Sequence, residues 1–196
     1  LRRQRQMCIR DSISTMLLIL TNQYSIETPN YKLVKKYKNF EIRDYEKMIV
    51  AHTKIKRTFR ESTSTGFRRI ANYIFGGNDK SMEIAMTAPV LTKFPSDINS
   101  NIFEVSFVMP KEHNLKSLPS PDLETVSISE RQLGRVAVFK FGGWATENRT
   151  KYYIDQLINS LKKERIDALG DIMVAQYNSP WVMPPFRKNE IIISIK

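Results

Sequence analysis

The sequence is poor in cysteine and histidine, which limits the chemistry that it can carry. Of its 196 residues, one is cysteine (Cys8) and two are histidine (His52 and His113). Because no cysteine follows residue 8, the rest of the chain can form neither a cysteine nucleophile nor a metal–thiolate site. The motifs G-x-S-x-G and H-E-x-x-H and the Walker phosphate loop are also absent. We therefore expect no enzyme, no catalytic residue and no metal site.

The sequence also lacks an apolar run long enough to cross a membrane. The run Met16–Leu20 is far shorter than the roughly 20 residues that a span needs. Basic residues precede it, as in an export signal, but no small-residue cleavage site follows, so both cytoplasm and export stay open. The first twelve residues, LRRQRQMCIRDS, resemble translated adapter DNA. We expect residues 1–26 to be an artefactual or disordered extension and residues 27–196 to form one domain.

Composition and charge are those of a basic, soluble globular chain. Hydrophobic residues make up 41% and charged residues 26%, which argues against disorder and against a membrane protein. The formal net charge is +11, so the chain attracts anionic partners non-specifically. No nucleic-acid-binding module accompanies the basic runs, so we expect no specific nucleic-acid partner. We expect a monomer.

Apolar periodicity predicts two units of the same order: strand, strand, helix, strand, strand. The first unit (about 31–110) has strands at 40–45 and 48–55, a helix at 61–75, and strands at 83–92 and 102–109. The second (about 122–196) has strands at 124–131 and 135–141, a helix at 148–163, and strands at 171–177 and 190–195. The first two strands of each unit are expected to pair as a hairpin, because RDYEKMIVAHT and RQLGRVAVFKF match in pattern.

This pattern predicts an α+β fold, a distorted antiparallel β-barrel built as a pseudo-repeat with two helices outside. The two halves would form a cup whose apolar lining is open to a planar ligand. Within EIAMTAPVLTKFP, Pro89 lacks a backbone N–H, so the strand is expected to bend there, at an edge or a bulge.

The chain resembles the SOUL haem-binding protein family. Two of the segments, MTAPV and RKNE, are specific because generic strand composition does not produce them. The resemblance implies the fold just described and reversible, non-covalent binding of haem or another porphyrin, for buffering or transport. It rests on segments that lie in the family's order: FEIRDY (40–45), GFRRIANYIFGGND (66–79), IAMTAPV (84–90), FVMP (107–110), FGGW (141–144) and YNSPWVMPPFRKNE (177–190).

A tetrapyrrole carrier needs an apolar groove with cations at its mouth for the propionates. We expect that groove between the first helix and the loop before the last strand. The expected contacts are Phe67, Ile70, Tyr73 and Ile74 from the helix, Trp181 and Met183 from the loop, and Arg68 and Arg69 for the propionates. Each set also has an interpretation without a ligand. The apolar helix residues could be core, Trp181 and Met183 could plug the end of the barrel, and the two arginines could lie on a solvated helix face.

The chain departs from the family at four positions. Where some members have a histidine proposed as an axial iron ligand, this sequence has Asp44, a poor partner for haem iron. Other members have an arginine or a lysine near the propionates at three positions, where this sequence has Ser64, Asn72 and Met183, so all three charges are absent. The two histidines present are expected to be packing or solvent residues.

A second functional class remains open. Effector-binding domains of transcription regulators share a related fold, and in them an acidic groove residue pairs with cationic drugs. A small-molecule sensor or hydrolase of that type would require acidic side chains to converge in the barrel, for which Glu41, Asp44 and Glu83 are candidates.

Overall fold

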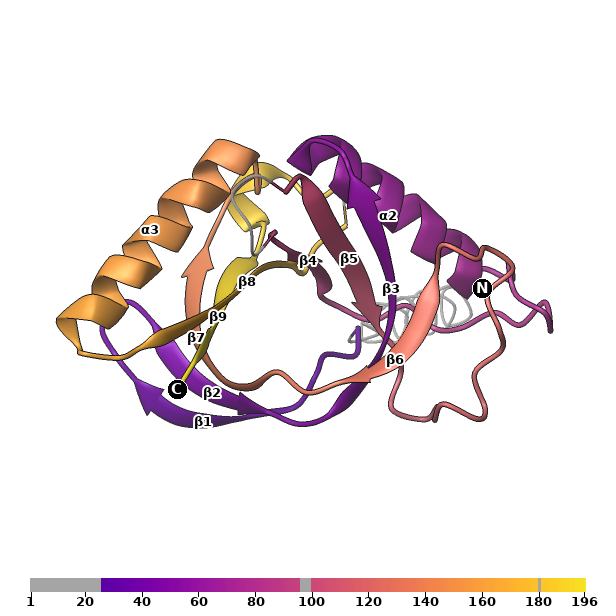
Figure 1. Cartoon of the computed structure of the whole chain (residues 1–196), viewed down its shortest axis with the longest axis horizontal. Coiled ribbons are helices and arrows are strands. Elements are labelled where there is room, and N and C mark those ends of the chain that lie inside the picture. Colours follow the sequence, from indigo (N-terminus) through magenta and orange to yellow (C-terminus); the bar gives the residue numbers. More distant parts are fainter. Residues whose placement is uncertain (1–25, 96–99, 180) are drawn as a thin grey trace, which may run out of the picture.

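Two helices cover the outer side of a strongly curled sheet (Figure 1). The computed structural model describes residues 26–95, 100–179 and 181–196, so the predicted extension lies outside the described residues except for Ile26. The helices are α2 (Phe59–Ile74) and α3 (Glu147–Lys163), and a short 3-10 helix, η1 (Pro184–Phe186), precedes the last strand. The strands are β1 (Tyr31–Lys36), β2 (Glu41–Tyr45), β3 (Met48–Lys56), β4 (Val90–Lys93), β5 (Ile102–Val108), β6 (Ser127–Arg131), β7 (Gly134–Phe141), β8 (Ala168–Gln176) and β9 (Asn189–Ile195).

The sheet confirms the predicted pseudo-repeat. All neighbouring strands are antiparallel, in the order β1-β2-β7-β9-β8-β4-β5-β3-β6. Without β1, exchanging each strand of one unit for its counterpart in the other gives the same order read from the opposite end. Arg43 lies opposite Val136, and Arg131 lies opposite Met48. The second pair repeats the first at a constant distance along the chain, because 131 − 43 and 136 − 48 are both 88 residues. The α+β distorted barrel with two helices is therefore confirmed.

The predicted hairpins are wrong. β2 pairs with β7 and β6 pairs with β3, so the first strand of each unit joins the second strand of the other unit. An alternating pattern indicates that a strand has one buried face, but it does not identify the strand beside it. The β2–β7 and β3–β6 pairings therefore join the two halves, in addition to the central β4–β8 pairing.

The strand predicted at 83–92 is much shorter, because β4 covers only Val90–Lys93. The preceding segment makes two isolated bridges, at Glu83 and Thr87, and the Ala88–Pro89 peptide is cis. Pro89 has no N–H to donate, so the ladder begins after it and does not bend at it. Sequence reasoning also missed β1, a lysine-rich edge strand whose residues are all exposed.

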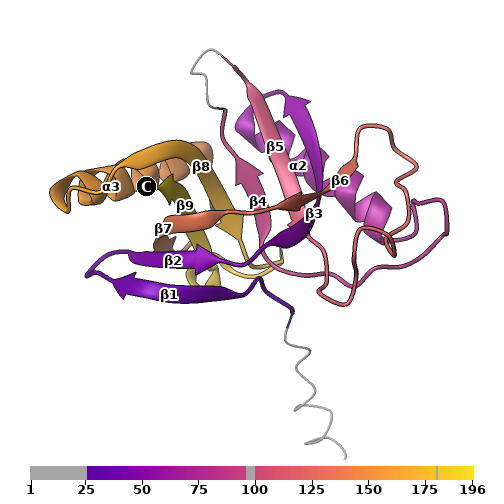
Figure 2. The ribbon, with the colours of Figure 1, turned by 60° about the horizontal axis from the view of Figure 1, so that its bottom comes forward.

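Local signals set where the helices begin. The Thr58 hydroxyl caps α2 by accepting from the Glu61 backbone N–H, and it donates to the Glu61 carboxylate. Thr146 caps α3 in the same way, by accepting from the backbone N–H of Arg149. Figure 2 shows the helices at opposite ends of the sheet: α2 packs on β3 and β5, and α3 packs on β7, β8 and β9. Neither helix has the length and apolar character needed to span a bilayer, among the residues described.

Three apolar clusters form the core. One lies between α3 and the sheet and includes Phe141, Leu157 and Ile191. A second lies between α2 and the sheet and includes Ile70, Tyr73 and Ile74. The third lines the inner face of the curl, and the pocket that remains open on this side is described below. Its buried members are Tyr45, Met48, Val50, Leu91, Val108, Val136, Val138, Met173, Ala175 and Ile192.

Candidate functional site

A groove of about 750 Å³ lies outside the sheet, between α2 and the connection from β7 to α3. Its volume is in the range of small-molecule sites. Five apolar residues and several polar ones form its walls. The lining residues are Phe59, Arg60, Thr63, Ser64, Phe67, Arg68, Val90, Trp144, Ala145, Thr146, Glu147, Asn148, Gln176, Asn178 and Arg187.

One wall is a single face of α2. Arg60, Ser64 and Phe67 follow one another at spacings of four and three residues, so their side chains line up along the helix. Phe67 is half-buried and packs against Phe107 of β5, with ring centroids 5.3 Å apart. Its ring therefore has one side against the sheet and a second side toward the groove.

The opposite wall forms where two segments distant in sequence are tied together. Gly143 lies in the left-handed region (φ 81°), which turns the chain from β7 toward α3. Its N–H donates to the carbonyl of Pro184 (3.1 Å), and its carbonyl accepts from the side chain of Asn189 (2.8 Å). These bonds place Trp144 beside Arg187, whose guanidinium lies 3.7 Å from the indole ring.

The groove has an excess of positive charge. Three guanidinium groups line it, those of Arg60, Arg68 and Arg187, together with one carboxylate, Glu147. Glu147 pairs with Lys151 at 2.7 Å. Within the described part of the chain, neither Arg60 nor Arg68 forms an ion pair. The site therefore offers arginine donors to an anionic group beside apolar walls.

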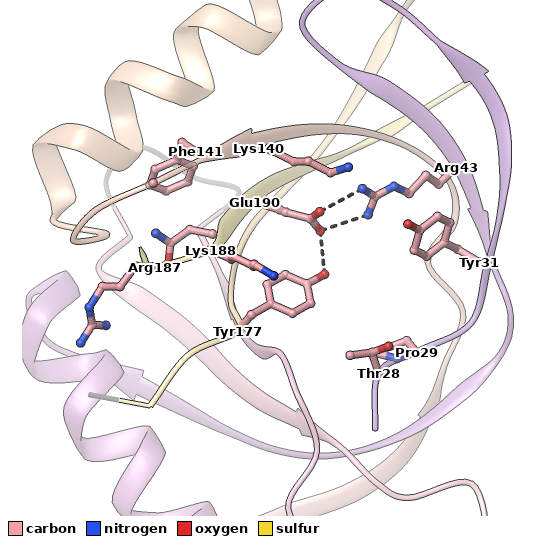
Figure 3. Close-up of a pocket in the computed structure, with 12 residues that line it drawn as sticks. Thr28, Pro29, Tyr31, Arg43, Lys140, Phe141, Tyr177, Arg187, Lys188 and Glu190 are labelled. Atoms are coloured by element: carbon pink, nitrogen blue, oxygen red, sulfur yellow. Dashed lines mark hydrogen bonds and ion pairs between the residues drawn. The ribbon is translucent and has the colours of Figure 1, made fainter. Parts of the chain in front are cut away.

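A second pocket, which we call the concave pocket, opens on the inner side of the sheet and has a volume of about 600 Å³ (Figure 3). Its floor is a buried ion-pair network. Arg43 is 1% exposed and donates to both carboxylate oxygens of Glu190, at 2.9 and 3.0 Å. Tyr177 donates to the same carboxylate at 2.6 Å. The lining residues are Thr28, Pro29, Tyr31, Arg43, Lys140, Phe141, Gly142, Tyr177, Arg187, Lys188, Asn189 and Glu190.

The charge network fixes the protonation state of its members. Burial acts to lower the pKa of Arg43, but its hydrogen bonds to Glu190 and Glu41 outweigh burial and raise it. Burial and the neighbouring Glu190 carboxylate raise the pKa of Tyr177. At neutral pH Arg43 is therefore a guanidinium and Tyr177 a neutral phenol.

Comparison with known proteins identifies the family. The family model for the SOUL heme-binding protein matches residues 26–194. The chain belongs to the SOUL haem-binding protein family. This SOUL protein is 31% identical to heme-binding protein 1 of Mus musculus over 134 residues, which cover 67% of this chain and 70% of that protein. It is 27% identical to heme-binding protein 2 of Homo sapiens over 176 residues, 85% of each chain.

Solved structures with the same fold have diverged far in sequence. The EcmrR C-terminal domain superposes with a TM-score of 0.61 at 12% identity, covering 85% of this chain and 98% of that one. A hydrolase from Listeria innocua superposes with a TM-score of 0.57 at 11% identity, covering 83% and 94%. At these identities the similarity establishes the fold and carries no functional assignment.

The structure brings only part of the predicted site together. The groove lies where the sequence indicated, since Asn178 and Arg187 come from the loop before β9, and Phe67 and Arg68 line it. Ile70, Tyr73 and Ile74 lie in the core under α2, with exposures of 0–1%, and do not line the groove. The Tyr73 hydroxyl donates to the carbonyl of Pro119, and burial raises its pKa to about 12.

The remaining predicted residues also lie elsewhere. Arg69 donates to the hydroxyl of Thr53 on the sheet (3.2 Å), away from the groove lining. Trp181 and Met183 are 92% and 63% exposed, so they neither plug the barrel nor line the groove. A role for these residues in ligand contact stays a prediction.

Sequence reasoning missed Arg60, Trp144 and Arg187. The signal for Arg60 was its helical spacing from Phe67, which places both on one face of α2. Trp144 and Arg187 lie within FGGW and FRKNE, two segments that had marked the family. Their proximity depends on the hydrogen bonds between two distant loops, which no local pattern reveals.

Among the described residues that line the groove there is no histidine, cysteine, methionine or tyrosine that could coordinate haem iron. Asp44, at the position of the proposed axial histidine, forms two bonds with Arg135 at 2.9 and 3.0 Å, and these lower its pKa. Of the three positions that lack a family cation, Ser64 lines the groove, whereas Met183 does not. Arg60 and Arg68 flank Ser64 by one helical turn on either side, so they offer positive charge on the same face.

Proposed function

We propose that this SOUL protein binds haem or a related tetrapyrrole non-covalently in the groove beside α2, and that it buffers or transports the ligand. One observation carries the proposal: a groove walled by Phe67 and Trp144 has three arginines along it. Family membership supports the same ligand class. The proposal includes no chemical step by the protein.

The groove matches the two chemical parts of a porphyrin. The flat macrocycle gains free energy by leaving water, at about 25 cal/mol per Å² of apolar surface buried. The propionates gain charge-assisted hydrogen bonds from guanidinium groups. Because the lining residues include no histidine, cysteine, methionine or tyrosine, affinity should depend on the macrocycle and its propionates and not on the metal. Metal-free protoporphyrin is therefore expected to bind with about the same affinity as haemin.

A haemin titration followed by the Soret band tests this function. Phe67→Asp places a charge on the apolar wall and should weaken binding at least about tenfold, equivalent to 1.4 kcal/mol. Arg68 and Arg69 offer a matched pair, because they are neighbours and only Arg68 lines the groove. Arg68→Gln should weaken binding, and Arg69→Gln should leave it unchanged. The absence of a saturable Soret change at micromolar haemin would remove the proposal.

The concave pocket gives no support to a sensor of cationic drugs. Of the lining residues that the structure describes, Glu190 alone has a carboxylate, and it is already bonded to Arg43 and Tyr177. A cation entering the pocket would have to compete with a buried guanidinium for that carboxylate.

A further inference from the structure

The concave pocket carries charge that haem binding beside α2 does not use. Four cations line it, Arg43, Lys140, Arg187 and Lys188, against one carboxylate, Glu190. The pocket is wide enough, at about 600 Å³, for a small organic molecule.

The floor of the pocket is fully paired. Arg43 uses all five of its N–H groups, on Glu41, Tyr45 and Glu190, and the ring of Tyr31 lies 4.2 Å from its guanidinium. Glu190 in turn accepts two bonds from Arg43 and one from Tyr177. The floor is therefore electrically balanced and leaves no unpaired carboxylate for a cationic ligand.

Unbalanced positive charge lies at the opening. Lys188 is exposed, and its ammonium has no ion pair or hydrogen bond to any residue that the structure describes. Lys140 pairs with Glu41 at 2.8 Å but is 58% exposed, so it can turn toward a second anion. Figure 3 shows Lys140 and Lys188 on either side of Glu190, with the Lys140 ammonium toward Arg43 and the Lys188 ammonium toward Tyr177. Tyr31 and Phe141 add aromatic surface to the lining.

We propose that the concave pocket is a second binding site, for a small organic anion with a carboxylate or phosphate group on a flat apolar body. Lys188 and Lys140 hold the anionic group. Tyr31 and Phe141 contact the apolar body, and the balanced floor excludes cations. Lys188 and Lys140 are not among the described residues that line the groove beside α2, whereas Arg187 lines both sites. The proposal therefore stands or fails independently of haem binding.

Two probes with the same ring and opposite charge test the site: 2-naphthoate and 2-naphthylmethylammonium, titrated calorimetrically against the full chain. Naphthoate should bind with a Kd below about 1 mM, and the ammonium compound should not bind. Lys188→Glu should weaken naphthoate at least about tenfold. Lys116→Glu makes the same charge change at an exposed lysine outside the pocket and should change affinity less than about twofold.

Haemin separates the two sites. Lys188→Glu should leave the haemin titration unchanged, and Phe67→Asp should leave naphthoate binding unchanged. The proposal is overturned if naphthoate does not bind at about 1 mM, if the ammonium compound binds as tightly, or if both lysine variants weaken binding equally. Loss of naphthoate binding in Phe67→Asp would likewise overturn it, because the probe would then occupy the groove beside α2.

Discussion

Replacing Gly66 by alanine should destabilise the protein, although alanine is the better helix former. Gly66 lies on the face of α2 that packs against β5, and a Cβ atom there would lie 2.5 Å from both Cβ and Cγ2 of Val105. Carbon atoms in contact prefer about 3.5–4.0 Å, so α2 would have to move away from the sheet by about 1 Å. Val105 is fully buried on a strand with neighbours on both sides, so it cannot yield.

The size of the effect follows from two opposing contributions. Overpacking in a rigid core costs up to about 3 kcal/mol, and Gly→Ala in a helix returns about 1 kcal/mol. The expected net loss is about 2 kcal/mol, which lowers Tm by about 4–8 °C in a domain of this size. Moving α2 also shifts the wall that carries Phe67, so haemin affinity should fall together with stability.

Urea unfolding followed by tryptophan fluorescence measures the loss. Ser64→Ala is the control, because Ser64 is exposed on the same helix and has no close contact to relieve. It should leave stability unchanged or raise it slightly. If Gly66→Ala proves as stable as the parent protein, then α2 does not rest on β5 at this separation, and the close approach that positions the groove wall is wrong.

Two further predictions concern charged groups inside the curl. Arg43→Met leaves the carboxylates of Glu41 and Glu190 without their guanidinium and should cost about 3–5 kcal/mol in urea unfolding. Arg135→Met removes an exposed pair and should cost below about 1 kcal/mol; equal losses would contradict burial of the network. Burial lowers the pKa of His52 despite a nearby carboxylate, so the neutral form is favoured in the folded state. The contribution of His52 to stability should therefore be full above about pH 6.5 and should be lost as the pH falls toward 5. His52→Gln should flatten this pH dependence. A parent protein whose stability does not change between these pH values would refute the prediction.

Arg43 and Arg131 show how far the internal repeat extends. They occupy equivalent positions on β2 and β6, and each reaches over the neighbouring strand to a carboxylate on the next one. Arg43 bonds Glu190 on β9, and Arg131 bonds Glu104 on β5. The matched segments that begin at these arginines were visible in the sequence, but their carboxylate partners were not, because each partner comes from the last strand of the other unit.

The candidate site was predictable in position but only partly in composition. Helical spacing placed Phe67, Ile70 and Ile74 together on one side of α2, and that side divides between core and groove. Arg68 and Arg69 are chemically identical neighbours, yet one lines the groove and the other bonds Thr53 on the sheet. Two consecutive residues of a helix point about 100° apart around its axis. The sequence does not show which of the two directions faces the sheet.

The order and type of the elements follow from the amino-acid pattern, because apolar periodicity and helix caps act over a few residues. Both helices and the doubled unit could be inferred in this way. The partner of each strand and the meeting of Trp144 with Arg187 follow only from the folded chain. They depend on contacts between residues far apart in sequence, where the packing of the whole sheet selects among pairings that are locally equivalent.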